Sequence, residues 1–430
     1  MPDSEIADFG GKVNQEETYT TEHEFQVIGL IPDMENTITF TPEAEDGTIT
    51  TASCKYKMGS LAGEEEVQLK QTAGQTDASS QISLPDSGLY VILGNDSDDV
   101  DFMYYYDENG TIRGEVPLIG YRSHRLVFEN NRMYYSISET KIAAVNELGM
   151  VEQVYDLGNY QLHHDYVFDD DGNLLILATD TGKQTVEDCV LKLNPSTGEV
   201  SCILDLEDLL GDYKESLGMD QEDLDWVHIN TIQWMGDNEI LVSSRETSTI
   251  VKITDIYGTP EIAYMMGEKT YWEDSDYADL LLDKANSFTS QTGQHSITYV
   301  EDDSLADGQY YLYMFNNNFG YSSTNTAYDW SQLNIPTEVK AEDAVSKYYK
   351  YLVDESKGTY ELVDTFDVPY SPYVSSVQNI GGNTIVDSGM AFNFQEYDSD
   401  HTLIRSFTME GEKYIYRVYK YTFDGFYFNQ

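Results

Sequence analysis

Three histidines occupy equivalent places in a unit that recurs along the chain. His163 opens one copy, His228 opens a second and His295 opens a third. The spacing from His163 to Asn173 equals the spacing from His228 to Asn238, which indicates a shared register. Imidazole can act near neutral pH as a nucleophile, a proton carrier or a metal ligand. If the copies form a closed array, the three rings converge on its axis and can carry out chemistry together.

Further polar residues belong to the same units. Asn230 lies two positions after His228 and therefore points the same way on an extended strand. Arg245 ends the second strand of that unit, at the same end of the strand pair as His228. An arginine beside imidazoles favours an anion-binding site, in contrast to the acidity of the chain as a whole. His164 is expected on the opposite face from His163, unless a β-bulge shifts it.

A zinc ion is the obvious alternative explanation for three histidines, because three imidazoles form a common catalytic zinc site. Arg245 and the lack of a well-placed carboxylate partner disfavour this alternative, and we expect no metal. Asp165 and Asp225 keep it open, since carboxylates often orient metal-bound imidazoles. In a third interpretation the histidines are hydrogen-bonded structural residues of a non-catalytic binding protein.

The segments that carry these residues have the pattern of paired short strands. Each histidine copy is a strand, a turn and a second strand, with apolar residues at alternate positions. Residues 121–131 and 373–383 repeat the register without a histidine at the first position, and residues 89–106 form a further hairpin. These are about six units of roughly 40 to 80 residues, enough for propeller blades with long loops. The sequence therefore predicts an all-β protein built on a six-bladed β-propeller.

The chain divides into three predicted segments. Residues 1–20 are a polar lead-in, and residues 21–85 contain short alternating runs typical of a small β-sandwich-like N-terminal domain. That segment is short for a whole sandwich, and truncation would explain this. Residues 86–430 are predicted to form the propeller.

Composition excludes several classes of partner. The 430 residues include 77 acidic and 24 basic side chains, a formal charge of −53. This charge argues against nucleic acid and anionic membrane surfaces as partners. The sequence contains no transmembrane run and no signal peptide. Cys189 and Cys202 flank a hairpin turn and are expected nearly opposite each other, as a disulfide or as two free thiols, which leaves Cys54 unpaired.

Several segments combine into a specific pattern. They are His163-His164-Asp165 with residues 171–175, residues 225–230 with Ser243-Ser244-Arg245, Gln294-His295 before residues 316–318, residues 31–38, and Ser371-Pro372 with residues 375–378. Together they closely resemble the bacterial aryl sulfotransferase family that works without phosphoadenosine phosphosulfate. The resemblance covers most of the chain from about residue 25.

The resemblance implies a six-bladed propeller, usually with an N-terminal β-sandwich, that moves a sulfuryl group from an aryl sulfate to a phenol. It also implies a ping-pong mechanism through a sulfated histidine, for which His295 matches the nucleophile. The groups that would hold the sulfuryl oxygens and balance their charge are His163 or His164, His228 and Arg245. Asn230 matches a polar substrate-binding residue, and Ser375 or Ser376 falls where the family can carry a threonine.

The resemblance further implies small-molecule partners and no cofactor. The chain has no G-x-x-x-x-G-K-S/T loop that would hold a nucleotide donor. An extracytoplasmic location (secreted, periplasmic or cell-surface) is expected, with the export signal absent from this chain, and a homodimer is compatible with this interpretation. The functional alternatives are a metal-dependent lactonase or lyase propeller and a non-catalytic binding propeller.

Overall fold

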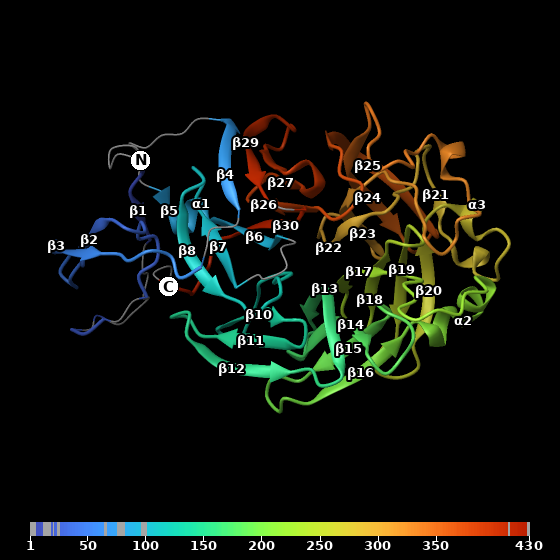
Figure 1. Ribbon diagram of the computed structural model, residues 1–430, viewed down its shortest axis with the longest axis horizontal. Helices are drawn as coiled ribbons and strands as arrows, with labels where there is room; N and C mark the ends of the chain where they lie inside the picture. The colour runs from blue at the N-terminus through green and yellow to red at the C-terminus, as the bar shows by residue number, and fades with distance from the viewer. Residues whose placement is uncertain are drawn as a thin grey trace.

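Six β-sheets follow one another around a common axis in the computed structural model of the protein (Figure 1). The structure describes residues 6–11, 19, 21–23, 26–63, 67–74, 82–95, 101–411 and 413–427. Neighbouring strands in these sheets are antiparallel except for β21 and β25, which pair in parallel, and the antiparallel pairing follows from the alternating runs and short turns of the sequence. The predicted all-β, six-bladed β-propeller is confirmed.

Blades 1 to 3 each consist of four strands that run in order from the axis to the outer edge. Blade 1 contains β30 (Ile415–Tyr421), β6 (Leu89–Asn95), β7 (Phe102–Tyr106) and β8 (Ile112–Pro117). Blade 2 contains β9 (Val127–Glu129), β10 (Arg132–Ser138), β11 (Lys141–Val145) and β12 (Val151–Asp156). Blade 3 contains β13 (Tyr160–Phe168), β14 (Leu174–Asp180), β15 (Cys189–Leu193) and β16 (Val200–Asp205).

Blades 4 to 6 follow the same order from the axis outward, and blades 5 and 6 gain an additional outer strand. Blade 4 contains β17 (Ile229–Trp234), β18 (Ile240–Ser244), β19 (Thr249–Thr254) and β20 (Glu261–Met266). Blade 5 contains β22 (His295–Val300), β23 (Gln309–Asn316), β24 (Val345–Asp354), β25 (Thr359–Pro369) and β21 (Asp283–Lys284). Blade 6 contains β26 (Ser376–Ile380), β27 (Asn383–Ser388), β28 (Asn393–Tyr397), β29 (Leu403–Glu410) and β4 (Gln68–Ala73).

Both ends of the chain contribute to the ring. The last strand, β30, pairs with β6 and supplies the innermost strand of blade 1. The early strand β4 pairs with β29 at the outer edge of blade 6, although residues 68–73 lie inside the segment expected to form the N-terminal domain. The predicted boundary at residue 85 therefore does not separate all propeller strands from that domain.

Apolar residues fill the spaces between neighbouring blades. Alternate residues of one strand face opposite neighbours, as a period of two requires. In β14, Leu174 and Ile176 pack toward blade 2, whereas Leu175 and Leu177 pack toward blade 4. Six such clusters of described residues lie between the six pairs of adjacent blades. This packing fixes the position of each innermost strand, and thereby of the side chains at the axis.

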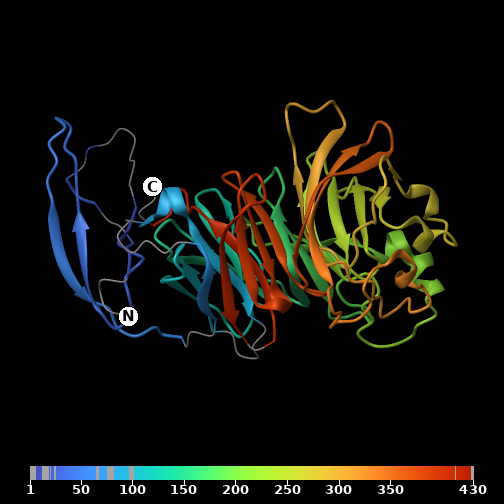
Figure 2. The same cartoon turned by 90° about the horizontal axis from the view of Figure 1, so that it is seen from above.

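The N-terminal region projects from one side of the propeller (Figure 2). Its antiparallel pair, β2 (Glu35–Phe40) and β3 (Ala52–Lys57), has mostly exposed side chains. Within the predicted lead-in, β1 (Phe9–Gly10) pairs in parallel with β5 (Ile82–Ser83), next to α1 (Leu84–Ser87). Residues 1–5, 12–18 and 20 of that lead-in lie outside the described residues.

Helices are short and lie in the connections between strands. They are α2 (Glu207–Ser216), α3 (Lys269–Trp272) and the 3₁₀ turns η2 (Ala278–Leu280), η3 (Trp330–Leu333) and η4 (Gly389–Ala391). Among the described residues, no helix has the length and apolar character needed to cross a bilayer.

The cysteines of blade 3 are free thiols, one of the two alternatives left by the sequence. A register shift between Val190 and Leu191 places Cys202 opposite Leu191 and Cys189 opposite Asp205, but the two thiols still interact through a side-chain hydrogen bond, so the cysteines lie nearly opposite each other as expected. Cys54 is also free.

Candidate active site

A polar residue lies at or near the start of five innermost strands, and in the sixth, β13, a histidine lies at the irregular middle of the strand. These residues are His124, His164, His228, His295, Ser375 and Tyr416. Because the innermost strands surround the axis, their starts gather at one end of it. The side chains that the sequence predicted to converge therefore share one site, and His124 and Tyr416 join them.

The innermost strands of blades 3, 4 and 5 are irregular at this end. Their pairing shifts between Leu162 and Tyr166, between Ile229 and Thr231, and between His295 and Thr298. A non-glycine residue adopts positive φ within or beside each shift: 54° at His164, 48° at His228 and 56° at Ser296. Such conformations are uncommon away from glycine and persist where surrounding contacts enforce them. The bulges re-aim the histidines relative to a regular strand.

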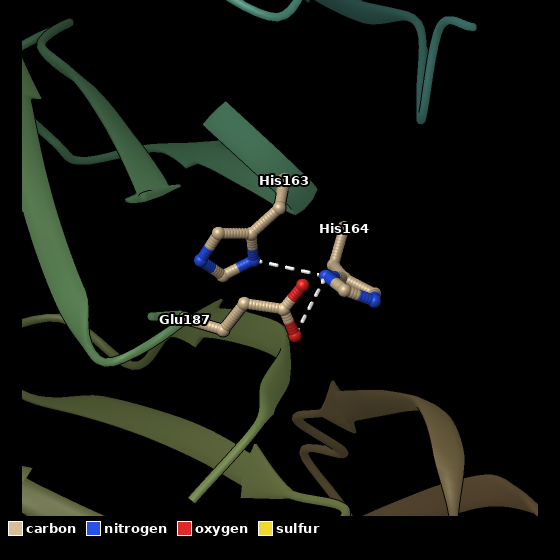
Figure 3. Close-up of side chains that lie close together, drawn as sticks. All are labelled: His163, His164 and Glu187. Carbon is tan, nitrogen blue, oxygen red and sulfur yellow. Dashed lines mark hydrogen bonds and ion pairs between the residues drawn. The ribbon is translucent and has the colours of Figure 1, made fainter. Parts of the chain in front are cut away.

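The bulge in β13 brings both of its histidines into the site. The Nδ1 atoms of His163 and His164 are 2.9 Å apart, and the rings meet edge to face (Figure 3). His164 therefore does not point to the opposite face, as a regular strand would have required. Burial lowers the pKa of His163, and burial together with neighbouring His228 lowers that of His164 well below its usual value. Both rings are neutral at neutral pH.

His228 lies next to His164, with 4.8 Å between the ring centroids. Its Nδ1 donates a hydrogen bond to Asp225 Oδ2 at 2.6 Å and pairs with Glu187 Oε2 at 2.8 Å. The same Glu187 oxygen lies 3.7 Å from His164 Nδ1 (Figure 3). The expectation that no carboxylate is well placed near the histidines is therefore wrong.

The distances between the side-chain nitrogen and oxygen atoms of these residues are those of hydrogen bonds and ion pairs, and not those of metal ligands. Donor atoms of His163, His164 and Glu187, and of Glu187, Asp225 and His228, lie within 4.8 Å of one another, close enough to consider a metal ion. Tetrahedral zinc with bonds of about 2.0 Å separates its ligands by roughly 3.3 Å. The separations of 2.9 Å between His163 and His164 and of 2.6 Å between His228 and Asp225 are instead those of hydrogen bonds, and the 2.8 Å between His228 and Glu187 is that of an ion pair. Asp165, which kept the zinc alternative open, pairs with Arg417 at 3.0 Å.

His295 is held through one ring nitrogen. Its Nδ1 lies 2.9 Å from the Gly293 carbonyl and 2.8 Å from Asn317 Oδ1, so Nδ1 carries the proton. Its Nε2 makes no hydrogen bond to another described residue, and the lone pair there is available. Burial, with the positive charges of His228, Arg245 and Arg417 nearby, lowers the pKa of His295 to about 3. The imidazole is therefore neutral over the whole physiological range.

Arg245 lies beside His228, as predicted, and its backbone N–H donates to the His228 carbonyl at 3.0 Å. The guanidinium is 5.2 Å from the ring centroid of Tyr373 and 5.9 Å from that of Tyr321. Glu246 pairs with it at 3.1 Å, and hydroxyl and backbone donors of residues 322–324 bind the other oxygen of that carboxylate. These contacts hold the guanidinium of Arg245 in a fixed position within the site.

The two predicted substrate-binding residues are engaged within the protein. Asn230 Nδ2 donates to the Gln294 carbonyl at 2.7 Å, which joins blade 4 to the residue before His295. Ser375 Oγ donates to Ser371 Oγ at 2.7 Å and accepts from the Gly389 N–H at 3.0 Å. Their roles in substrate binding stay predictions.

Tyr416 lies at the centre of the site, although no pattern in the sequence pointed to it. Its ring centroid is 5.5 Å from those of His124 and His164 and 6.5 Å from that of His295. The Arg122 guanidinium lies 4.7 Å from the same ring. The Tyr416 hydroxyl and both ring nitrogens of His124 are buried without a hydrogen-bond partner among the described residues. This composition suits an anionic ligand.

Arg417 connects several of the blades that carry the site residues. It is fully buried and donates to Asp165 Oδ1 and to the carbonyls of His124 and Asn230. Its partners belong to blades 2, 3 and 4, whereas Arg417 itself belongs to blade 1. One side chain therefore fixes the relative position of four blades at the axis.

Fold and site together define a β-propeller with an imidazole- and guanidinium-lined site at one end of its axis. The chain belongs to the arylsulfotransferase family. The family model described as Arylsulfotransferase (ASST) matches residues 75–420, and the model of the Arylsulfotransferase Ig-like domain matches residues 1–59. This membership places the protein among the sulfotransferases.

Two solved structures illustrate the more distant similarities. A protein of unknown function from Bacteroides caccae is 12% identical, with a TM-score of 0.44, and the match covers 77% of this chain and 98% of that one. A catalytically inactive variant of virginiamycin B lyase from Staphylococcus aureus, solved with quinupristin, is 12% identical, with a TM-score of 0.41 and coverage of 81% and 98%. No curated protein gives a significant match.

Proposed function

We propose that the protein transfers a sulfuryl group from an aryl sulfate to a phenol by a ping-pong mechanism through a sulfohistidine at His295, without a nucleotide donor. The observation that carries this proposal is the neutral, oriented imidazole of His295. Gly293 and Asn317 hold its Nδ1–H, and its Nε2 is the available nucleophile. Arg245 and Arg417 lie close enough to influence its charge.

In the first half-reaction, His295 Nε2 attacks the sulfur of the aryl sulfate. An N–S bond forms, the S–O bond to the aryl group breaks, and the phenoxide leaves with a proton from an acid in the site. In the second half-reaction, an acceptor phenol returns that proton to the site and its oxygen attacks sulfur. The N–S bond then breaks and His295 is restored. Such transfers depend mainly on position and charge balance.

The other polar groups of the site can stabilise the negative charge of the sulfuryl oxygens. Arg245 supplies a permanent positive charge that is held by Glu246 and flanked by two tyrosines. Because His163 and His164 share one Nδ1–H between them, the ring whose Nδ1 accepts keeps an Nε2–H and can donate a hydrogen bond without the cost of burying further charge. We assign substrate binding to this group and nucleophilic attack to His295.

A coupled transfer assay tests the proposal. The purified protein is incubated with 4-nitrophenyl sulfate, with and without phenol, and both products are measured. We expect 4-nitrophenol release to require phenol and to be matched by an equal amount of phenyl sulfate. Release as inorganic sulfate, or no release at all, would contradict the proposed transfer and favour a non-catalytic or unrelated propeller function.

We expect the activity to survive exhaustive chelation. The charge of the transferred group is balanced by Arg245 and the imidazoles, and the donor atoms around Glu187 are at hydrogen-bonding separations. Transfer rates are measured before and after dialysis against a strong chelator, with a zinc enzyme treated in parallel as the control. Loss of activity that zinc or calcium restores would instead support a metal-dependent lactonase- or lyase-type propeller.

A further inference from the structure

His228 is the one histidine of the site whose ring nitrogen faces two carboxylates. Glu187 and Asp225 both approach Nδ1, at 2.8 and 2.6 Å. The side chains of His228 and Glu187 are only 19% and 22% exposed, so water screens this attraction little. Nε2 of His228 makes no hydrogen bond to a described residue and is left for a ligand.

Backbone hydrogen bonds between blades 3 and 4 determine the position of Glu187. It lies in the connection between β14 and β15, which is hydrogen-bonded to the segment preceding β17 and to the first residue of β17. Leu224 N–H donates to the Gln184 carbonyl at 2.9 Å, and Ile229 N–H donates to the Glu187 carbonyl at 3.1 Å. Blade 3 thus places a carboxylate against the histidine of blade 4. Glu187 itself has φ of 58°, a conformation that these contacts enforce.

The other charged and titratable groups near His228 and Glu187 do not cancel the effect of the two carboxylates on the pKa of His228. The groups that face His228 or its carboxylate partners are Glu187, Asp225, His163, His164, His295, Arg122 and Arg245. Burial alone would lower the pKa of His228, but Glu187 and then Asp225 outweigh it and raise the value to about 10. The imidazolium in turn holds the pKa of Glu187 below its usual value, against the effect of burial.

We propose that Glu187 is a positioning residue that holds His228 as an imidazolium with Nε2–H presented to the oxygen of the scissile S–O bond. This inference rests on the proposed sulfuryl transfer. As the S–O bond breaks, Nε2–H passes its proton to the departing phenoxide and His228 becomes neutral. In the second half-reaction the acceptor phenol returns its proton to Nε2 while its oxygen attacks sulfur. Protons therefore balance over one cycle.

This arrangement selects a substrate class. A phenol without activating groups has a pKa of about 10, so its phenoxide leaves poorly unless a proton reaches its oxygen as the S–O bond breaks. His228 held by two carboxylates therefore suits sulfate esters of unactivated phenols, whose phenoxides are poor leaving groups. Esters of acidic phenols, such as 4-nitrophenol, need this proton much less.

The test compares Glu187→Gln with the parent protein on two donors, phenyl sulfate and 4-nitrophenyl sulfate, each with the same phenolic acceptor. We expect kcat/KM for phenyl sulfate at pH 8 to fall by about 100-fold, and that for 4-nitrophenyl sulfate by less than about 3-fold. Removing one carboxylate lowers the pKa of His228, so the variant should regain activity with phenyl sulfate as the pH falls toward 5.5. Glu187→Asp should restore part of the loss.

Two controls separate this role from a structural one. Glu199→Gln makes the same change at an exposed site of the same blade, between β15 and β16, and should behave as the parent protein. The parent protein itself provides a readout that needs no variant: its kcat/KM for phenyl sulfate should stay constant with rising pH and fall only as the pH approaches 10. This follows because the imidazolium is present below its raised pKa.

The outcomes distinguish the inference from the proposed function. An equal loss with both donors at every pH, or a parent profile that falls with a midpoint near the ordinary histidine value of about 6.5, would overturn the role of Glu187. Absence of transfer from either donor in the parent protein would instead overturn the sulfuryl transfer on which it rests. If Glu187→Gln does not fold, as judged by circular dichroism, the parent profile alone decides.

Discussion

His295→Ala is expected to abolish sulfuryl transfer, with a loss in kcat of at least about 10⁴-fold. The substitution removes the Nε2 lone pair that attacks sulfur, and none of the neighbouring imidazoles shares its arrangement. Nδ1 of His295 is fixed by Gly293 and Asn317, whereas Nδ1 of His163 and His164 bond to each other. Transfer rates and intact mass after incubation with donor alone are the measurements. Only the parent protein should gain the mass of one sulfuryl group.

We expect the His295→Ala variant to fold, with a modest loss of stability. His295 is almost fully buried, and its removal leaves Asn317 Oδ1 without that partner, which costs about 1 to 3 kcal/mol. Asn317 keeps two bonds from Nδ2 to backbone carbonyls. His401→Ala, in which the histidine pairs with Asp364 away from the site, is the matched control. A sulfuryl adduct or normal turnover in His295→Ala would remove His295 from the mechanism.

Arg245→Ala should lower kcat/KM for the aryl sulfate by roughly 10- to 1000-fold at every salt concentration. The guanidinium carries a permanent charge and is largely buried in the site, and salt screens a buried contact less than exposed charges. Initial rates at several donor concentrations give the value. Arg245→Lys should recover only part of it, because an ammonium keeps the charge but loses the planar fork.

The control for Arg245 is Arg132→Ala, which removes an arginine from an exposed ion pair with Glu152. This variant should retain the parent kcat/KM. If Arg245→Ala does so as well, the sulfuryl group is held by the imidazoles or by Arg122 instead. A loss in both variants would indicate a general electrostatic effect of the strongly acidic surface.

Period-two patterning and the histidine spacing were sufficient to predict the propeller, because they report directly on which strands line the axis. Each of His163, His228 and His295 lies three residues before the point where regular pairing of the innermost strand resumes, at Tyr166, Thr231 and Thr298. The alternation of apolar and polar residues does not show where a β-bulge occurs, because one additional residue in a strand hardly changes its composition. The orientation of His164 therefore followed only from the pairing of β13 with β14.

The remaining site residues could not be predicted, because tertiary structure brings them from elsewhere in the chain. Glu187 is one of many acidic residues in a connection, and nothing local distinguishes it from exposed neighbours. Its importance arises from hydrogen bonds to the segment before β17. Tyr416 and Arg417 lie in an aromatic run whose pairing with β6 is nonlocal. The histidine preceding β9, His124, does not share the register that identified the others.

Tyr416 and Arg417 belong to β30, the strand that closes the ring, and this has a consequence for biosynthesis. Residues 415–421 pair with residues 89–95, so almost the whole chain must leave the ribosome before blade 1 is complete. Until then, Asp165 lacks the guanidinium of Arg417 and the histidines lack the ring of Tyr416. Such a long-range contact also forms slowly, since its loop entropy must be overcome first. In a nascent chain the site therefore lacks these contacts until the last strand docks.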